Sequence, residues 1–155
     1  MSKTYIIDTN LLVLLIVGKT SERFVNTHKQ TSSYTIDDFI LLDLILSGAT
    51  KIVVTPNILS ETSNLIRQFS EPGRGQIIEF FKFFVENVCE IYVESVLVIE
   101  NKSFNRLGLT DASILSVQEK DTIILTDDLN LYLASDALGK TVINFSHARE
   151  QMIGG

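Results

Sequence analysis

The stretch LGLTDASILSVQEKDTIILTDDLN, residues 107–130, decides the fold class. Its first part has helical apolar spacing from Thr110 onward, and TIILT at 122–126 is a run of strand-forming residues. Helical spacing returns in LNLYLASDALG at 129–139. A strand between two helices is the repeating unit of α/β proteins with parallel sheets.

The same alternation continues through the rest of the chain. Further strands are predicted at 4–7, 51–55, 90–93 and 141–145, and further helices at 11–17, 36–48, 57–69 and 76–88. Thr55 and Pro56 supply an N-cap and a first-turn proline. Residues 18–35 are polar and form a loop or a surface helix, whereas 95–106 fit a strand or a helix. We therefore predict a mainly parallel sheet covered by helices on both faces.

The composition predicts a single domain, residues 1–155, with a sizeable core, because 45% of the residues are hydrophobic. A net charge of −6 and a pI near 4.8 argue against a protein that coats nucleic acid by bulk positive charge. Cys89 is the one cysteine, and no Cys and His residues have zinc-ligand spacing. We expect a cytoplasmic protein without structural zinc.

The apolar run LLVLLIV at 11–17 resembles the core of a signal peptide, but Asp8 and Asn10 interrupt its approach. No small-residue cleavage site follows, and the run is far shorter than the roughly 20 residues of a membrane-spanning helix. We predict a core helix that ends near Gly18, and no membrane partner.

Carboxylates follow two of the predicted strands. Asp8 follows the first strand, and Asp127 and Asp128 follow the strand at 122–126. Ligands of open α/β sheets bind beyond the carboxyl ends of the strands, so these acids point to a site. Each also has a simpler explanation: Asp8 or Asn10 caps the helix at 11–17, and Asp127 or Asp128 caps the next one.

Two further acids lie on predicted helices. Glu61 shares the apolar face of Ile58 and Leu65, so it either points inward and needs a partner or lies at the margin and reaches water. Asp111 shares a face with Ile114 but also lies in a first helical turn, where the helix dipole favours an acid.

These acids together predict a divalent-metal site, because converging carboxylates repel one another unless cations neutralise them. Oxygen ligands without Cys or His favour Mg²⁺ or Mn²⁺ over zinc. The sequence contains no pattern for nucleophilic catalysis: there is no G-x-S-x-G, and the two histidines have no triad context.

Four motifs, in order along the chain, resemble those of PIN domains: IIDTN at 6–10, a helical Glu61 after TP, LTDASIL at 109–115 and ILTDD at 124–128. The resemblance implies a three-layer α/β/α fold with a five-stranded parallel sheet and an Mg²⁺- or Mn²⁺-dependent nuclease site. It implies metal ligands at Asp8, Glu61, Asp111 and Asp128, with Asn10 and Thr126 as polar supports.

The resemblance also bears on activity and partners. Small single-domain members are similar to VapC-like toxins, which cut RNA, pair with an antitoxin protein and form homodimers. The apolar FILLDLIL at 39–46 offers surface for such a dimer, whereas residues 18–35 make this chain longer than that group. RNA would be guided by residues beside the site, for which the candidates are Lys19, Arg23, Lys29 and Arg67.

Strand alternation sends the side chains of Asp127 and Asp128 in opposite directions, so only one faces the metal. The T-x-D pattern of the resemblance selects Asp128 and leaves Asp127 to orient neighbouring groups or to help cap the helix. The competing interpretation makes Asp128 a simple N-cap.

Three other functions compete with a ribonuclease: a catalytically inactive PIN-like interaction module, a DNA flap-type nuclease, and a receiver-like signalling domain. The full set of acids argues against the first, and the positions of Glu61 and Asp111 do not suit the last.

Overall fold

The computed structural model describes residues 2–119 and 121–154, and its centre is a five-stranded sheet in which every pairing is parallel. The strands are β1 (Thr4–Ile7), β2 (Lys51–Val54), β3 (Cys89–Glu90), β4 (Thr122–Thr126) and β5 (Thr141–Asn144), in the order β3-β2-β1-β4-β5. Tyr5 of β1 is in register with Ile52 of β2 and Ile123 of β4. The predicted α/β fold with a five-stranded parallel sheet is confirmed.

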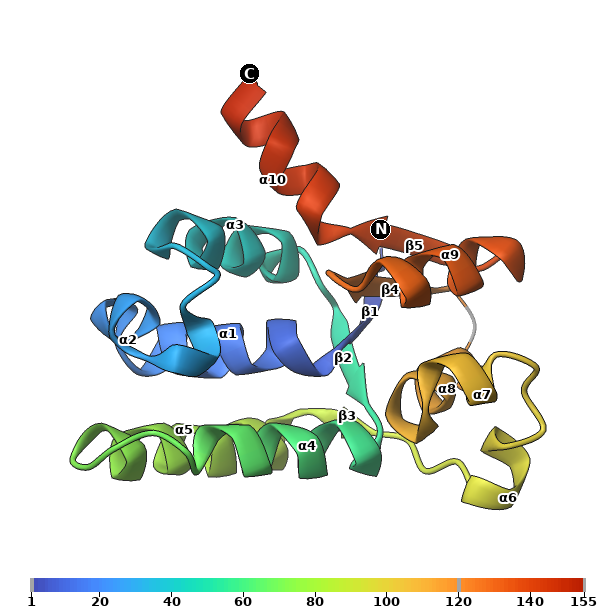
Figure 1. Cartoon of the computed structure of the whole chain (residues 1–155), viewed down its shortest axis with the longest axis horizontal. Helices are drawn as coiled ribbons and strands as arrows, with labels where there is room; N and C mark the ends of the chain where they lie inside the picture. Colours follow the sequence, from blue (N-terminus) through green and yellow to red (C-terminus); the bar gives the residue numbers. More distant parts are fainter. Residues whose placement is uncertain (1, 120, 155) are drawn as a thin grey trace.

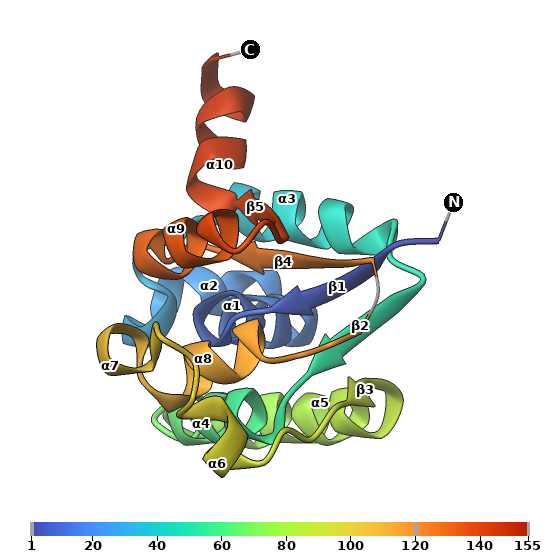
Figure 2. The same cartoon turned by 90° about the vertical axis from the view of Figure 1, so that its right-hand side faces the viewer.

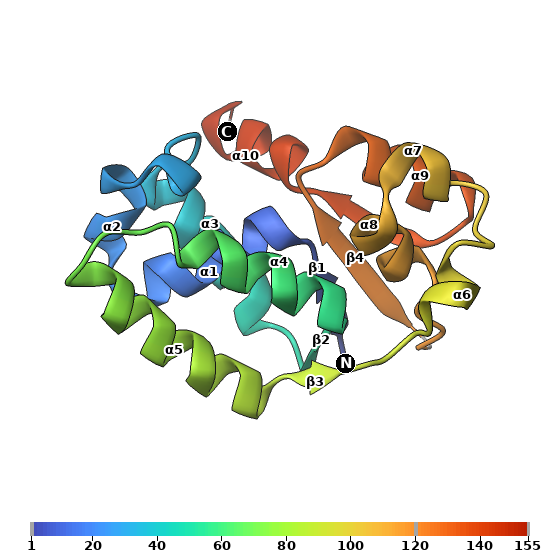
Figure 3. The same ribbon diagram turned by 60° about the horizontal axis from the view of Figure 1, so that its bottom comes forward.

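The helices form the two outer layers (Figures 1 and 3). On one side lie α1 (Thr9–Thr20), α2 (Glu22–Thr27), the 3-10 turn η1 (Lys29–Thr31), α3 (Ile36–Ser47), α4 (Pro56–Ile66) and α5 (Gly73–Asn87). On the other side lie α6 (Ser95–Val98), α7 (Phe104–Leu107), α8 (Leu109–Leu115) and α9 (Leu129–Ala137). A further helix, α10 (Phe145–Gly154), projects away from both layers (Figure 2).

The strand order places a topological switch point between β1 and β4. The chain moves outward from β1 to β2 and β3, then returns to the other side of β1 for β4 and β5. The backbone beyond these two strands stays close, since the Asp8 amide donates a 3.2 Å hydrogen bond to the Leu125 carbonyl. Such switch points are where open α/β sheets bind ligands.

Helix α1 is buried on nearly every side, because it lies between α3 and the helices α4 and α5 (Figure 1). This helix was predicted to end near Gly18, and it ends two residues later, at Thr20. A Cβ atom on Gly18 would lie 2.1 Å from the Phe39 ring, so glycine is required here for the close approach of α1 and α3.

The segments that the sequence left open are mostly short helices. Residues 18–35 contain the end of α1 together with α2 and η1, and residues 95–106 contain α6 and most of α7. The last predicted strand ends at Asn144 rather than at Phe145, which begins α10, a helix that the sequence pattern did not predict.

Within the described part of the chain, none of the helices is long and apolar enough to cross a membrane.

Candidate functional site

Asp8 lies at the carboxyl end of β1 and is 5% exposed. It is the N-cap of α1, because its Oδ1 accepts a 3.2 Å hydrogen bond from the Leu11 amide. Its Oδ2 accepts from the Thr126 hydroxyl and, at 3.1 Å, from the Asp127 amide. Burial outweighs these hydrogen bonds and raises the pKa of the Asp8 carboxyl to about 6.

Thr126, the last residue of β4, connects Asp8 to Asp128. Its fully buried hydroxyl donates to Asp8 and accepts a 3.0 Å hydrogen bond from the Asp128 amide. Asp128 is exposed and caps α9, since its Oδ1 accepts a 2.9 Å hydrogen bond from the Leu131 amide. Thr126 therefore contacts both acids, as a supporting role would need, and the capping contact of Asp128 is also present.

Asp111 lies in the first turn of α8 and is half-buried. Burial, together with the negative charges of Asp128, Asp8 and Glu61, raises the pKa of its carboxyl to about 7. The helix dipole alone would lower this pKa. Burial is the larger cause of the rise, and the carboxylates that add to it come from three other elements: the ends of β1 and β4, and α4.

Glu61 is exposed, so of the two alternatives the structure supports the margin of the α4 apolar stripe over an inward-facing side chain. Its Oε2 accepts a hydrogen bond from the Thr110 hydroxyl at the start of α8. The partial loss of solvent around the carboxyl raises the pKa of Glu61 above its ordinary value. The contact fastens α4 to α8 and brings Glu61 toward Asp111.

The four predicted ligands thus belong to one acidic cluster, which we define as Asp8, Glu61, Asp111 and Asp128. The cluster lies beyond the carboxyl ends of β1 and β4, at the switch point of the sheet.

Asp127 points elsewhere. Its Oδ2 accepts a 2.8 Å hydrogen bond from the Tyr34 hydroxyl and its Oδ1 accepts from the Ser146 hydroxyl. Its charge is among the causes of the raised pKa of Asp8 but not among those for Asp111. The predicted divergence of Asp127 and Asp128 is consistent with these contacts.

The remaining predicted residues are less closely tied to the cluster. Asn10 is exposed in the first turn of α1, and the alternative that it caps this helix is wrong because Asp8 does so. Lys19 lies near the other end of α1, about 16 Å from Asp8 at the helical rise, and forms a 2.9 Å ion pair with Asp43. Arg23, Lys29 and Arg67 are all exposed.

The cluster fits a hard cation by its chemistry, although it is not a preformed cage. No group of three or more Asp, Glu, His or Cys side chains among the described residues is arranged to hold a metal ion as it stands. All the side chains of the cluster nonetheless offer oxygen atoms, which Mg²⁺ and Mn²⁺ prefer, and the charges of the other three raise the pKa of Asp111. Glu61 and Asp128 are exposed, so their side chains have room to turn inward. The neighbouring Thr9 hydroxyl is buried without a hydrogen-bond partner among the described residues.

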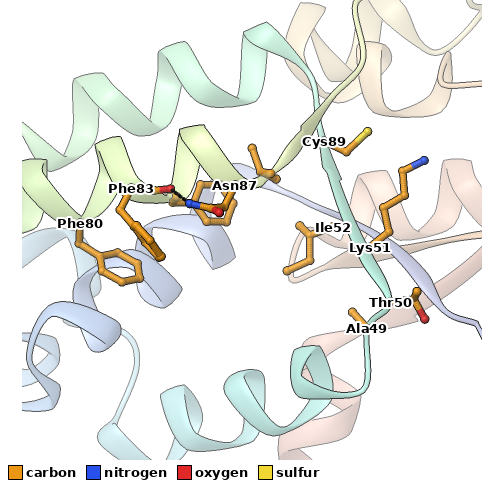
Figure 4. A pocket seen from close by; sticks show the side chains of 10 residues that line it. Ala49, Thr50, Lys51, Ile52, Phe80, Phe83, Asn87 and Cys89 are labelled. Carbon is orange, nitrogen blue, oxygen red and sulfur yellow. Dashed lines mark hydrogen bonds between the residues drawn. The ribbon is translucent and has the colours of Figure 1, made fainter.

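An apolar cavity of about 560 Å³ lies elsewhere, beside the start of β2 and the end of α5 (Figure 4). Its lining includes Lys51, Phe83 and Cys89, and no carboxylate is among its described lining residues. Because the acidic cluster lies beyond the opposite ends of the strands, this cavity is not part of it.

Three contributors to the site were not predicted from the sequence: Tyr34, Thr110 and Ser146. Thr110 stands next to Asp111 in a first helical turn, where its hydroxyl could have been suspected. Tyr34 and Ser146 carried no local signal, because their partner Asp127 is 93 and 19 residues away.

Comparison of the sequence with known protein-family models and with curated proteins found no match.

Proposed function

We propose that this chain is a metal-dependent endoribonuclease that hydrolyses RNA phosphodiester bonds. The observation that carries the proposal is the placement of the acids: Asp8 and Asp128 follow the neighbouring parallel strands β1 and β4 at the switch point of the sheet, and their charges and that of Glu61 act on the half-buried Asp111. The resemblance of the same four residues to PIN-domain motifs supports RNA as the substrate.

The acidic cluster would hold Mg²⁺ or Mn²⁺. When bound, such an ion lowers the pKa of a water molecule and stabilises charge on the phosphate and on the leaving oxygen. It would also offset the negative charge of the cluster, which otherwise faces a negatively charged substrate.

The protein's own groups set the geometry of the cluster. The Thr126 hydroxyl and the Asp127 amide hold one oxygen of Asp8, so the remaining lone pairs of this carboxylate have a fixed direction. The same hydroxyl accepts from the Asp128 amide, which fixes where Asp128 leaves the strand. Thr110 orients Glu61 from the neighbouring helix.

The test offers the purified protein an RNA and a DNA strand of the same sequence, with Mg²⁺ or Mn²⁺ and with excess EDTA. We expect cleavage of the RNA with metal and none with EDTA. Cleavage of the DNA and not of the RNA would show that the protein is a DNA nuclease and not a ribonuclease. Undiminished RNA cleavage in EDTA would remove the metal from the mechanism.

The matched variant is Asp111→Asn, which preserves the shape of the side chain and removes its charge. We expect it to lose RNA cleavage by orders of magnitude while its circular dichroism stays that of the wild type. A folded Asp111→Asn that cleaves at the wild-type rate would show that the cluster is not the active site.

The resemblance extends the proposal to a cytoplasmic toxin held inactive by an antitoxin protein, and to a homodimer. The dimer has support on α3, where Ile40 and Leu44 are 47% and 66% exposed on one face of the helix. Expression of the chain without a partner should arrest growth. If the cells grow normally although the purified protein cuts RNA, the chain is a nuclease but not a toxin.

A further inference from the structure

The side chain of Asp127 joins three segments that are distant in the sequence. One of its oxygens accepts a 2.8 Å hydrogen bond from the hydroxyl of Tyr34, which precedes α3. The other accepts from the hydroxyl of Ser146, in the first turn of α10. We call Tyr34, Asp127 and Ser146 the Asp127 network. It fastens the approach to α3 and the start of the C-terminal helix to the end of β4.

The backbone of Asp127 reaches the acidic cluster. Its amide donates a 3.1 Å hydrogen bond to Oδ2 of Asp8, the oxygen that also accepts from the Thr126 hydroxyl. A side chain held at both oxygens restricts the rotation of the peptide that carries this amide. The direction of the Asp8 carboxylate therefore depends on the Asp127 network.

Tyr34 is well placed to act as a fixed donor. It is 7% exposed, its ring packs edge-on against Phe145 at 6.4 Å, and the Arg149 guanidinium lies 5.4 Å from the ring centre. Arg149 is fixed in turn by 2.9 Å contacts with both carboxylate oxygens of Asp38. Burial, with the hydrogen bond to Asp127, raises the pKa of the Tyr34 hydroxyl, which therefore keeps its proton.

We propose that Tyr34 and Ser146 are positioning residues of the ribonuclease site, acting through Asp127 on Asp8, and that α10 is in this way part of the active structure. The inference rests on the proposed function, because Asp8 is one of the proposed metal ligands. Groups that orient a ligand without binding the metal commonly change metal affinity or activity by about 10- to 100-fold.

The main variant is Tyr34→Phe, which removes the hydroxyl and keeps the ring between Phe145 and Arg149. Two measurements are needed: the rise in melting temperature that Mn²⁺ causes, and kcat and KM for RNA cleavage. We expect a smaller rise and a kcat about tenfold lower, with KM nearly unchanged. Tyr92→Phe is the matched control, since Tyr92 is 73% exposed, and it should equal the wild type in both measurements.

Ser146→Ala tests the same network from α10 and should show the same two effects. If Tyr34→Phe does not fold, Ser146→Ala alone tests whether the Asp127 network positions Asp8. The inference is overturned, and the proposed function stands, if the wild type responds to Mn²⁺ and cuts RNA while both variants behave like it. A wild type that neither responds to Mn²⁺ nor cuts RNA overturns the inference together with the proposed function.

Discussion

At the scale of single residues, the hydroxyl of Thr126 links two carboxylates of the acidic cluster. It donates to Asp8 and accepts from the Asp128 amide, so one buried side chain sets the positions of acids that follow different strands. A hydroxyl can do both because it has one proton to give and lone pairs to accept.

The roles of the adjacent acids Asp127 and Asp128 are separable by Asp→Asn changes. Asn still caps a helix, so Asp128→Asn should keep its contact with the Leu131 amide and lose only the charge. We predict that Asp128→Asn stays folded and loses RNA cleavage by orders of magnitude. Asp127→Asn should lose at most about tenfold, the loss expected for Tyr34→Phe, because its amide oxygen still accepts a hydrogen bond from Tyr34 or Ser146.

Cleavage rates measured in the reverse order, with both variants folded by circular dichroism, would move the metal ligand from Asp128 to Asp127. Equal and near-wild-type rates for both would leave Asp128 with its capping role alone.

The raised pKa values of Asp8 and Asp111, about 6 and about 7 against an ordinary 3.8, predict how the metal-free protein responds to pH. Between pH 3.8 and about 7 the folded state binds more protons than the unfolded chain. The contribution of these two carboxyls to folding stability is therefore complete below their ordinary pKa and is lost as the pH rises through about 7. We therefore expect Asp111→Asn in EDTA to gain stability over the wild type as the pH rises from about 5 to about 8.

Melting curves of the two proteins across this range give the answer. A difference in melting temperature that does not change with pH would mean that Asp111 titrates normally and does not face the other acids.

At the scale of elements, the packing of α1 against α3 depends on Gly18. Alanine in a helix is usually more stable than glycine by up to about 1 kcal/mol, but a Cβ atom here would lie 2.1 Å from the Phe39 ring. We predict that Gly18→Ala lowers the free energy of unfolding by about 1–3 kcal/mol, because overpacking displaces the ring. Denaturant unfolding measures the change.

Gly48→Ala is the matched control, because its nearest neighbour would be the Ile45 carbonyl oxygen at 3.6 Å, an ordinary contact. It should change stability little. A Gly18→Ala protein as stable as this control would show that α1 and α3 pack less closely than the structure indicates.

The predictability of the elements followed the strength of their local signals. Strands β1, β2 and β4 are apolar runs that end at, or one residue before, an Asp or a Thr, and their positions were predicted to within a residue. Helices α6 and α7 have four residues each, too few for a periodicity to show. Helix α10 was missed because it is mostly polar and lacks a strong apolar stripe.

The site was predictable to the extent that chain geometry decides it. Asp8 and Asp128 follow parallel strands, and such residues meet at one edge whatever the rest of the sequence. Residue spacing alone did not show whether Glu61 points inward or lies at the margin of the apolar stripe of α4. That margin depends on where the neighbouring helix α8 packs. The contact between Tyr34 and Asp127 depends on the tertiary fold, so no local pattern could have indicated it.

At the scale of the whole molecule, the strand order β3-β2-β1-β4-β5 places the acidic cluster at the one reversal of the sheet. Helices α4 and α8, which carry Glu61 and Asp111, contact each other there (Figure 1). The cluster therefore draws on both outer layers, and its geometry depends on the fold as a unit.

The proposed homodimer is a second property of the whole molecule. We predict that the purified chain sediments as a dimer at micromolar concentration and that Leu44→Lys makes it a monomer, because a charge on the exposed face of α3 would be costly to bury. Leu138→Lys is the control, since Leu138 is also exposed, at 54%, but follows α9. A wild type that sediments as a monomer, or a Leu44→Lys protein that remains a dimer, would exclude this interface.

Binding of Mn²⁺ to the purified protein, followed by electron paramagnetic resonance, shows whether the acidic cluster holds a metal ion, and it needs neither the RNA nor a partner. The free-ion signal should fall as the wild type takes up at least one Mn²⁺ per chain, and Mg²⁺ should restore it by competition. Asp111→Asn and Asp8→Asn should leave most of the signal in place while retaining their fold. A wild type that leaves the Mn²⁺ signal unchanged, or variants that bind the ion as well as the wild type, would contradict the assignment of the acidic cluster as a metal site.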